Sequence, residues 1–112
     1  MINKNYIFIS YAHRDSDIVS PIIERLKTMY YIWYDDSIIP GTEWDENIAS
    51  HIESCNFFIA FMSKNFLRSS NCKDELNFAR DLDKKRIVIY LEPVELPSGI
   101  KMRIGRLQNI HK

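Results

Sequence analysis

Four short runs of apolar residues set the strongest limit on how this chain can fold. They are rich in β-branched and aromatic side chains, as is typical of strands. Most are apolar at successive positions instead of alternating, which indicates strands buried on both faces, as in a parallel sheet covered by helices. We therefore predict strands at Tyr6–Ile9, Tyr31–Tyr34, Phe57–Met62 and Arg86–Leu91.

The segments between the first three runs carry helical periodicity. After Asp15, apolar residues recur at three- and four-residue spacing, and Pro21 places the start of this helix near Asp17 or Ser20, or kinks it. Thr42 is a suitable N-cap for a second helix. The apolar stripe of that second helix is Trp44, Ile48 and Ile52.

A third helix is expected after Phe57–Met62. Ser63 can cap its start, and the polar stretch 69–71 divides it into a short turn and a longer helix from about Asn71. Strand and helix thus alternate at short intervals, which is the sequence form of a doubly wound α/β sheet. Such sheets bind ligands at the carboxyl ends of their strands, so we expect function in the loops that follow the strands.

The pattern changes after the fourth strand. Residues 92–99 are rich in proline and acidic residues, and only a basic segment and the run Leu107–Ile110 follow. We expect a fifth strand there, and one covering helix of the sheet is missing. The flank left bare is covered by residues beyond this chain, by another subunit, or by solvent.

Composition narrows the class of protein. Fifteen basic residues offset fifteen acidic ones, so no net field draws the chain to nucleic acid or to an anionic membrane. The N-terminus lacks a signal-peptide apolar stretch, and Phe57–Met62 is too short to cross a bilayer. Cys55 and Cys72 lack CxxC spacing, and three scattered histidines suggest no metal site. We expect a single cytoplasmic domain over residues 1–112, with buried thiols.

Glu75 occupies the oddest position in the third helix. On a helical wheel at about 100° per residue it falls inside the apolar sector. A carboxylate there is costly unless it pairs, protonates or faces a cleft, which favours a functional role. Alternatively, Glu75 accepts from Arg14 or from backbone amides and only helps the fold. Asn71 lies one turn earlier on the same side, where it borders the same pocket or simply caps the helix.

The loop before the second helix offers a second candidate surface. Ile38 and Ile39 precede the turn Pro40-Gly41, and they form an exposed contact surface if the loop projects, or fold back on the core. Trp44 either belongs to the core or reaches the pocket.

Three ordered motifs resemble one family. They are Phe8–Asp15, Ile32–Asp36 with Pro40–Trp44, and Ser69–Leu76. They look like the first box, the second strand with its BB loop, and the start of helix C of TIR (Toll/interleukin-1 receptor) domains of the bacterial type. The resemblance covers residues 5 to 110. It implies a flavodoxin-like three-layer α/β sandwich with a central parallel five-stranded sheet of order 2-1-3-4-5 and helices on both faces.

The resemblance also implies an activity, because many TIR domains are NAD+ glycohydrolases or cyclases. Glu75 matches their catalytic glutamate. Their nucleotide-contacting positions correspond to Tyr11, Ala12 and His13 and to the BB loop near Ile39, while Trp44 and Asn71 complete the predicted substrate site. NAD+ is the substrate, and neither a cofactor nor a metal is implied. Self-association is expected through the BB loop, at Ile38, Ile39, Pro40 and Gly41.

Two departures from the family pattern bear on activity. Asn71 stands where many active relatives have a tryptophan that stacks near the nicotinamide. Ala12-His13 stands where some relatives have arginines that can meet the pyrophosphate, which leaves Arg14 and His13 as substitutes.

Two other functions remain as alternatives. In the first, the chain is a non-catalytic TIR–TIR interaction module that signals by assembling into homo-oligomers or filaments. In the second, it is a phospho-receiver domain, but that class needs acidic residues after the first and third strands, where this chain has Ser10-Tyr11 and Ser63.

Overall fold

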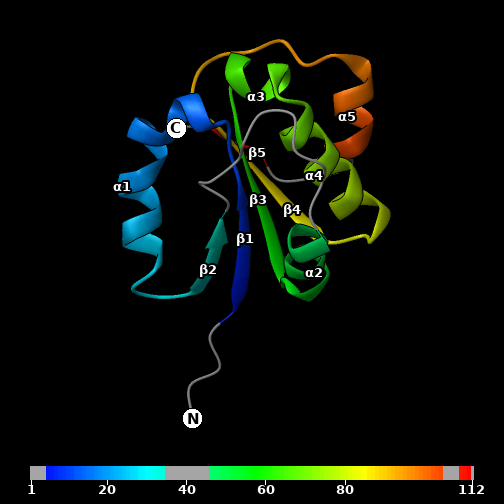
Figure 1. Ribbon diagram of the computed structural model, residues 1–112. Coiled ribbons are helices and arrows are strands. Elements are labelled where there is room, and N and C mark those ends of the chain that lie inside the picture. The colour runs from blue at the N-terminus through cyan, green and yellow to red at the C-terminus, as the bar shows by residue number, and fades with distance from the viewer. Residues whose placement is uncertain (1–4, 35–45, 105–108, 112) are drawn as a thin grey trace.

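All five strands lie in one parallel sheet. The computed structural model describes residues 5–34, 46–104 and 109–111, and the sheet order is β2-β1-β3-β4-β5 (Figure 1). This order and the parallel pairing confirm the predicted sheet. The strands are β1 Tyr6–Ser10, β2 Tyr31–Tyr34, β3 Phe57–Met62, β4 Lys85–Tyr90 and β5 Asn109–His111.

Helices cover both faces of this sheet. In Figure 1, α1 stands on one side, and α2, α4 and α5 stand on the other. A short 3-10 helix, η1, leads from β1 into α1, and α3 leads from β3 into α4. The helices are η1 His13–Asp15, α1 Ser16–Leu26, α2 Glu46–Ser54, α3 Lys64–Arg68, α4 Ser70–Asp81 and α5 Ser98–Ile104.

Successive side chains of β1 point to opposite faces of the sheet, so the strand contributes to two separate hydrophobic clusters. Ile7 and Ile9 pack with Val19 and Ile23 of α1. Phe8, the residue between them, packs on the other face. Its core contains Ile48 and Ile52 of α2, Cys72, Leu76 and Ala79 of α4, and Ile100 of α5. The continuous apolar runs are therefore explained by burial on both faces.

Helix α1 begins at Ser16, one residue before the first of the two predicted starts, Asp17, and the alternative start near Ser20 is wrong. Pro21 lies inside the helix. The apolar residues that recur at helical spacing after Asp15 include Ile18 and Met29. Neither is buried in the structure, because Ile18 is 45% exposed and Met29 lies beyond the helix end and is 57% exposed.

The predicted division of the third helical segment is also confirmed. Ser63 caps α3 by accepting a hydrogen bond from the Phe66 backbone N–H. Ser69 ends α3 and caps α4, accepting from the Cys72 backbone N–H at 3.2 Å. Each hydroxyl satisfies one of the backbone donors that a helix start leaves open.

Helix α5 was not predicted. Ile100 is buried in the main core, and the basic residues and Gly99 of the segment hide any helical stripe. Backbone N–H groups of Ile100 and Lys101 donate to the Pro97 carbonyl, which fixes its first turn. Val94 and Leu96, just upstream, also pack against the core of α2 and α4.

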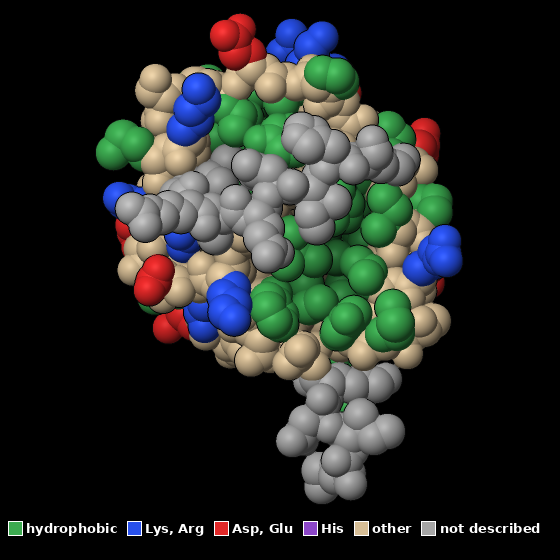
Figure 2. Space-filling view, turned by 180° about the vertical axis from the view of Figure 1, so that it is seen from behind, with side chains coloured by type: hydrophobic (Ala, Val, Ile, Leu, Met, Phe, Trp, Pro, Cys, Tyr) green, Lys and Arg blue, Asp and Glu red, His purple; other side chains and the backbone are tan. Residues whose placement is uncertain are grey.

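The α1 side of the sheet is less completely covered. Phe57 of β3 and Ile87 and Ile89 of β4 are half-buried and pack at the margin of the α1 cluster. Figure 2 shows hydrophobic side chains gathered on the face seen from behind. Within residues 5–34, 46–104 and 109–111, α1 is the long helix on this side of the sheet (Figure 1). None of the helices in the described ranges is long and apolar enough to cross a membrane.

Candidate functional site

Glu75 is buried against the carboxyl end of β1. Its side chain is 3% exposed, and the Ser10 hydroxyl donates a hydrogen bond to Glu75 Oε1 at 2.7 Å. Ser10 is the last residue of β1, and Glu75 lies in the second turn of α4. The helical wheel thus placed Glu75 correctly on the buried face, and the Ser10 hydroxyl is one of its hydrogen-bond donors.

Cys72 lies one turn before Glu75 and joins the same cluster. Its thiol hydrogen-bonds with the side chains of Ser69 and Ser10. Burial, and after it the charge of Glu75, raises the pKa of the Cys72 thiol to about 12. The thiol is therefore neutral at physiological pH and unsuited to act as a nucleophile. Both cysteines are free and buried, as the sequence suggests.

A second buried carboxylate, Asp15, ties the segment after β1 to the segment after β3. Ser63 Oγ donates to Asp15 Oδ2 at 2.5 Å, and Asn65 Nδ2 donates to Asp15 Oδ1 at 2.8 Å. Because Ser63 also caps α3, its one hydroxyl fixes both the helix start and the position of η1. Since β1 and β3 are neighbours, with Ser10 opposite Ala60, these two segments meet at one edge of the sheet.

A cavity of about 410 Å³ opens between these segments. Its lining carries three basic side chains, His13, Arg14 and Arg68, all exposed. Ser69, which caps α4, lines the cavity and contacts Cys72, so the cavity wall is linked through Cys72 and Ser10 to Glu75. The remaining lining residues are Ala12 and Asn65.

The structure brings some of the predicted substrate residues together and separates others. Ala12 and His13 line the cavity. Tyr11 is buried in the α1 cluster, where its ring lies 6.2 Å from that of Tyr34. Asn71 is half-buried as the second residue of α4, and the capping role open to it belongs to Ser69. The roles of these residues toward a substrate stay predictions.

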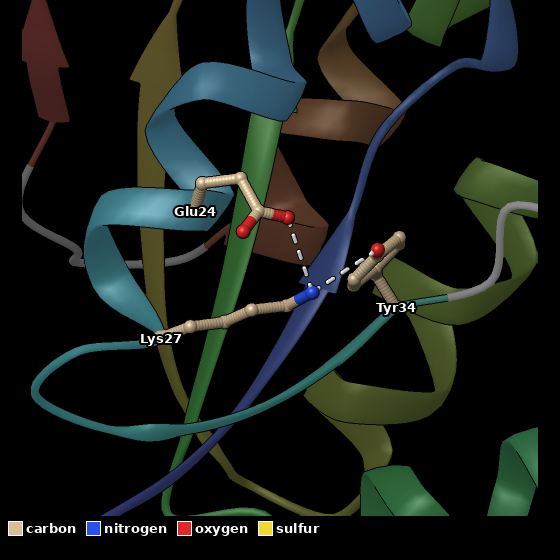
Figure 3. A network of polar contacts seen from close by, with 3 residues as sticks. All are labelled: Glu24, Lys27 and Tyr34. Atoms are coloured by element: carbon tan, nitrogen blue, oxygen red, sulfur yellow. Dashed lines mark hydrogen bonds and ion pairs between the residues drawn. The ribbon is translucent and has the colours of Figure 1, made fainter.

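The BB loop itself lies outside the described residues. This holds for Ile38, Ile39, Pro40 and Gly41, and also for Thr42 and Trp44. The strand that leads into it ends at Tyr34, where Lys27 of the α1–β2 turn donates to Glu24 at 3.3 Å and to the Tyr34 hydroxyl at 3.4 Å (Figure 3). These contacts are exposed, so each contributes little to stability.

Three residues of the site were not among the predicted ones. Ser10 holds Glu75, and Asn65 and Arg68 form the far wall of the cavity. Asn65 and Arg68 lie more than fifty positions from Ala12 in the chain, and only the pairing of β1 with β3 brings them to it. A polar residue at the end of a buried strand was the one available signal for Ser10.

The sheet order, the helices on both faces and the polar cluster at the carboxyl edge define a flavodoxin-like α/β domain. The sequence matches the TIR domain family over residues 7–111. The chain belongs to that family.

Relatives and solved structures agree with this assignment. The chain is 32% identical over 113 residues to Toll-like receptor 2 of Bos indicus, and 31% identical to Toll-like receptor 2 of Homo sapiens. Each match covers 92% of this chain and 14% of the receptor. The chain therefore spans about one seventh of these receptors' length.

Two solved structures share the fold. One is the TIR domain of the Toll-related receptor TRR-2 from Hydra magnipapillata, with a TM-score of 0.72 and 23% identity over 94% of this chain and 82% of that one. The other contains the TIR domains of the activated Roq1 resistosome, with a TM-score of 0.67 and 17% identity over 91% of this chain and 65% of that one. The bacterial subtype stays a prediction.

Proposed function

We propose that this TIR domain binds NAD+ and cleaves its nicotinamide–ribose bond, as a nucleosidase or a cyclase, when copies of the domain associate in the cytoplasm during signalling or defence. The observation that carries the proposal is a buried carboxylate, Glu75, held by Ser10 beside a basic cavity at the carboxyl edge of the sheet. This is the edge at which doubly wound sheets bind ligands.

The chemistry fits one carboxylate. As the glycosidic bond breaks, positive charge develops on the ribose, and a fixed carboxylate in a water-poor site stabilises it strongly. Nicotinamide leaves as a neutral base, so no second acid is needed. Water then adds at the anomeric carbon and releases a proton, giving ADP-ribose, or a ring nitrogen of the adenine adds instead and closes a cyclic product.

The burial of Glu75 favours control by assembly. With 3% of the side chain exposed, a ribose reaches the carboxylate only after a rearrangement at the carboxyl edge of the sheet. Contact between copies through the BB loop is a suitable source of that rearrangement, because conformational closure or opening commonly gates catalysis. Dilute protein should then be silent.

A non-catalytic interaction module is the second candidate. It is favoured by the similarity to Toll-like receptor 2, a receptor by name, and by Asn71, which cannot stack on nicotinamide as a tryptophan can. In this second function the domain still self-associates, but it does not cleave NAD+.

Nicotinamide release from NAD+ distinguishes the two. The assay uses concentrated protein with and without a crowding agent that favours assembly, beside Glu75→Ala. Release that disappears in the variant supports the enzyme. If folded wild-type protein releases no nicotinamide under any assembly condition, the interaction module is the better account.

A further inference from the structure

We propose that β2 is an interface between two copies of this chain, which pair edge to edge as antiparallel strands about a two-fold axis at Trp33. Within residues 5–34, 46–104 and 109–111, β2 is an edge of the sheet and pairs with β1 alone. It lies between α1 and α2 in Figure 1. An edge strand presents a row of backbone N–H and C=O groups to a further strand.

The hydrogen bonds to β1 show which backbone groups of β2 face away from the sheet. The Tyr31 backbone N–H donates to the Asn5 carbonyl at 3.0 Å, so the backbone groups of Tyr31 point toward β1. Along a strand, the direction of these groups alternates from one residue to the next. The N–H and C=O groups of Ile32 and Tyr34 therefore point outward, and those of Trp33 point toward β1.

A single symmetric register uses both outward residues. With Trp33 on the axis, Ile32 lies opposite Tyr34 of the second copy, and each such pair exchanges two hydrogen bonds. A register centred on Ile32 or on Tyr34 would pair one of them with itself and carry the other beyond the end of the strand. The contact repeats across a two-fold axis, so it closes after two copies.

The chemistry of β2 favours a second copy as the strand that pairs with it. None of its four side chains is charged and none is proline, the residues with which edge strands usually oppose such pairing. Lys27, which donates to the Tyr34 hydroxyl, also pairs with Glu24 at 3.3 Å, so the two charges beside the strand offset each other (Figure 3). The whole chain has no formal net charge, so two copies meet without net repulsion.

Trp33 is held in place before any second copy arrives. Its ring stacks on His51 of α2, with ring centroids 4.3 Å apart and 18° between the planes, and on Phe8, with centroids 5.0 Å apart. Trp33 is half-buried, so part of it stays accessible. On the axis, the two Trp33 residues would have Cα atoms about 4.5 Å apart, where aromatic pairs stabilise a sheet. Little side-chain freedom is lost on pairing, which favours association through a short strand.

Hydrogen exchange of single backbone amides, followed by NMR at low and high protein concentration, tests this pairing. Sedimentation gives the dimer fraction in the same samples. Once about nine-tenths of the chain is dimeric, the Ile32 and Tyr34 amides should exchange roughly tenfold more slowly, because exchange then requires dissociation. The Trp33 amide, which points toward β1, is the internal reference and should change far less.

A proline at an outward position provides an independent test. Ile32→Pro removes an outward N–H and leaves the groups that bond to β1, as an edge strand allows. It should weaken dimerisation by about tenfold or more, since each dimer loses two hydrogen bonds. Ile32→Val keeps the N–H and should dimerise as wild type does. Met29→Asp, in the turn before the strand, should also dimerise normally.

Three results would overturn the proposal. They are a wild-type monomer at about 1 mM, where even a millimolar affinity would populate a dimer, a dimer whose Ile32 and Tyr34 amides exchange as in the monomer, and a folded Ile32→Pro that dimerises as wild type does. If Ile32→Pro does not fold, the wild-type exchange rates decide alone. All measurements are made without NAD+, so their failure leaves the proposed cleavage standing. A β2-paired dimer that releases no nicotinamide keeps the interface and removes the enzyme.

Discussion

Glu75 is stabilised in the core by a specific donor. The Ser10 hydroxyl donates to it at 2.7 Å, and both side chains are almost fully buried. A buried carboxylate without such partners carries a large desolvation cost, so Ser10 and Glu75 depend on each other energetically.

Ser10→Ala should therefore lower the free energy of unfolding by about 2 kcal/mol, since a hydrogen bond to a charged group is worth roughly 1.5–3 kcal/mol. Urea denaturation measures the change. Ser20→Ala, at an exposed position of α1, serves as the control and should lie near wild type. Equal stability of Ser10→Ala and wild type would show that the bond does not hold Glu75.

Ionisation of the Cys72 thiol makes the free energy of unfolding depend on pH in the alkaline range. Its pKa is raised to about 12 in the folded protein, chiefly by burial, whereas an unfolded cysteine ionises near pH 8.5. The raised pKa stabilises the fold fully below about pH 8.5, and this contribution is lost as pH rises toward 12, because only the unfolded chain gains the charge.

Between pH 8 and 10.5, the free energy of unfolding should therefore fall less steeply in Cys72→Ala than in wild type. Parallel urea titrations at each pH measure the two slopes. Identical slopes would mean that Cys72 ionises equally in the folded and unfolded chain.

The sequence predicts where a site residue lies only when the period of a single helix or strand decides which face that residue occupies. The 3.6-residue period of α4 places Glu75 on the buried face. The two-residue period of β1 continues into the next turn, so Tyr11 packs toward α1 and Ala12 toward the opposite core. Family resemblance groups Tyr11, Ala12 and His13 together, and it does not convey this alternation.

Among the elements, the consecutive helices α3 and α4 are each capped by a serine, and the two serines differ in the other contacts they make. Ser69 caps α4 and also contacts the Cys72 thiol, whereas Ser63 caps α3 and donates to the buried carboxylate of Asp15. Both lie at the carboxyl edge of the sheet, where α3 and α4 position the cavity wall.

Ser69→Ala should cost about 1 kcal/mol of stability, the usual value for a lost N-cap. Ser63→Ala should cost more, about 2–3 kcal/mol, because Asp15 also loses a buried donor. Ser70→Ala, at the exposed first residue of α4, is the control. Thermal or urea unfolding gives the ranking, and a smaller cost for Ser63→Ala than for Ser69→Ala would contradict the role assigned to Asp15.

Elements with a strong period were predictable, and those held by tertiary contact were not. The four apolar runs correspond to β1 to β4 within one residue at each end, and the polar stretch 69–71 correctly divides α3 from α4. Helix α5 lacks a stripe in the sequence, and among its residues 98–102 Ile100 is the one buried in the main core. Its position follows from packing against α4, which a local pattern does not contain.

At the scale of the whole molecule, sheet order decides which segments can form a site. The order β2-β1-β3 brings the ends of β1 and β3 together, and with them Arg14 and Arg68. The order itself followed from family resemblance. The cavity did not, because its walls come from segments about fifty residues apart.

Assembly is the whole-molecule property on which the proposed activity depends. Nicotinamide release per mole of protein should rise with protein concentration, and Ile39→Asp should abolish the rise, since a charge on an apolar contact loop opposes association. Met29→Asp is the control, at an exposed apolar position on the α1–β2 turn. A rate per mole that is independent of concentration in wild type would contradict control by assembly.

If Glu75 is the catalytic carboxylate for NAD+ cleavage, its substitution must remove the activity. The measurement is the rate of nicotinamide release by assembled wild type, Glu75→Gln and Asp74→Asn, each shown to be folded by its thermal transition. Asp74 is the exposed carboxylate next to Glu75 on α4, so Asp74→Asn removes a charge from the same turn without entering the site. We expect Glu75→Gln to lose at least about a hundredfold in rate, as losing one transition-state contact typically does, and Asp74→Asn to match wild type. Equal rates in Glu75→Gln and wild type would contradict the catalytic role of Glu75.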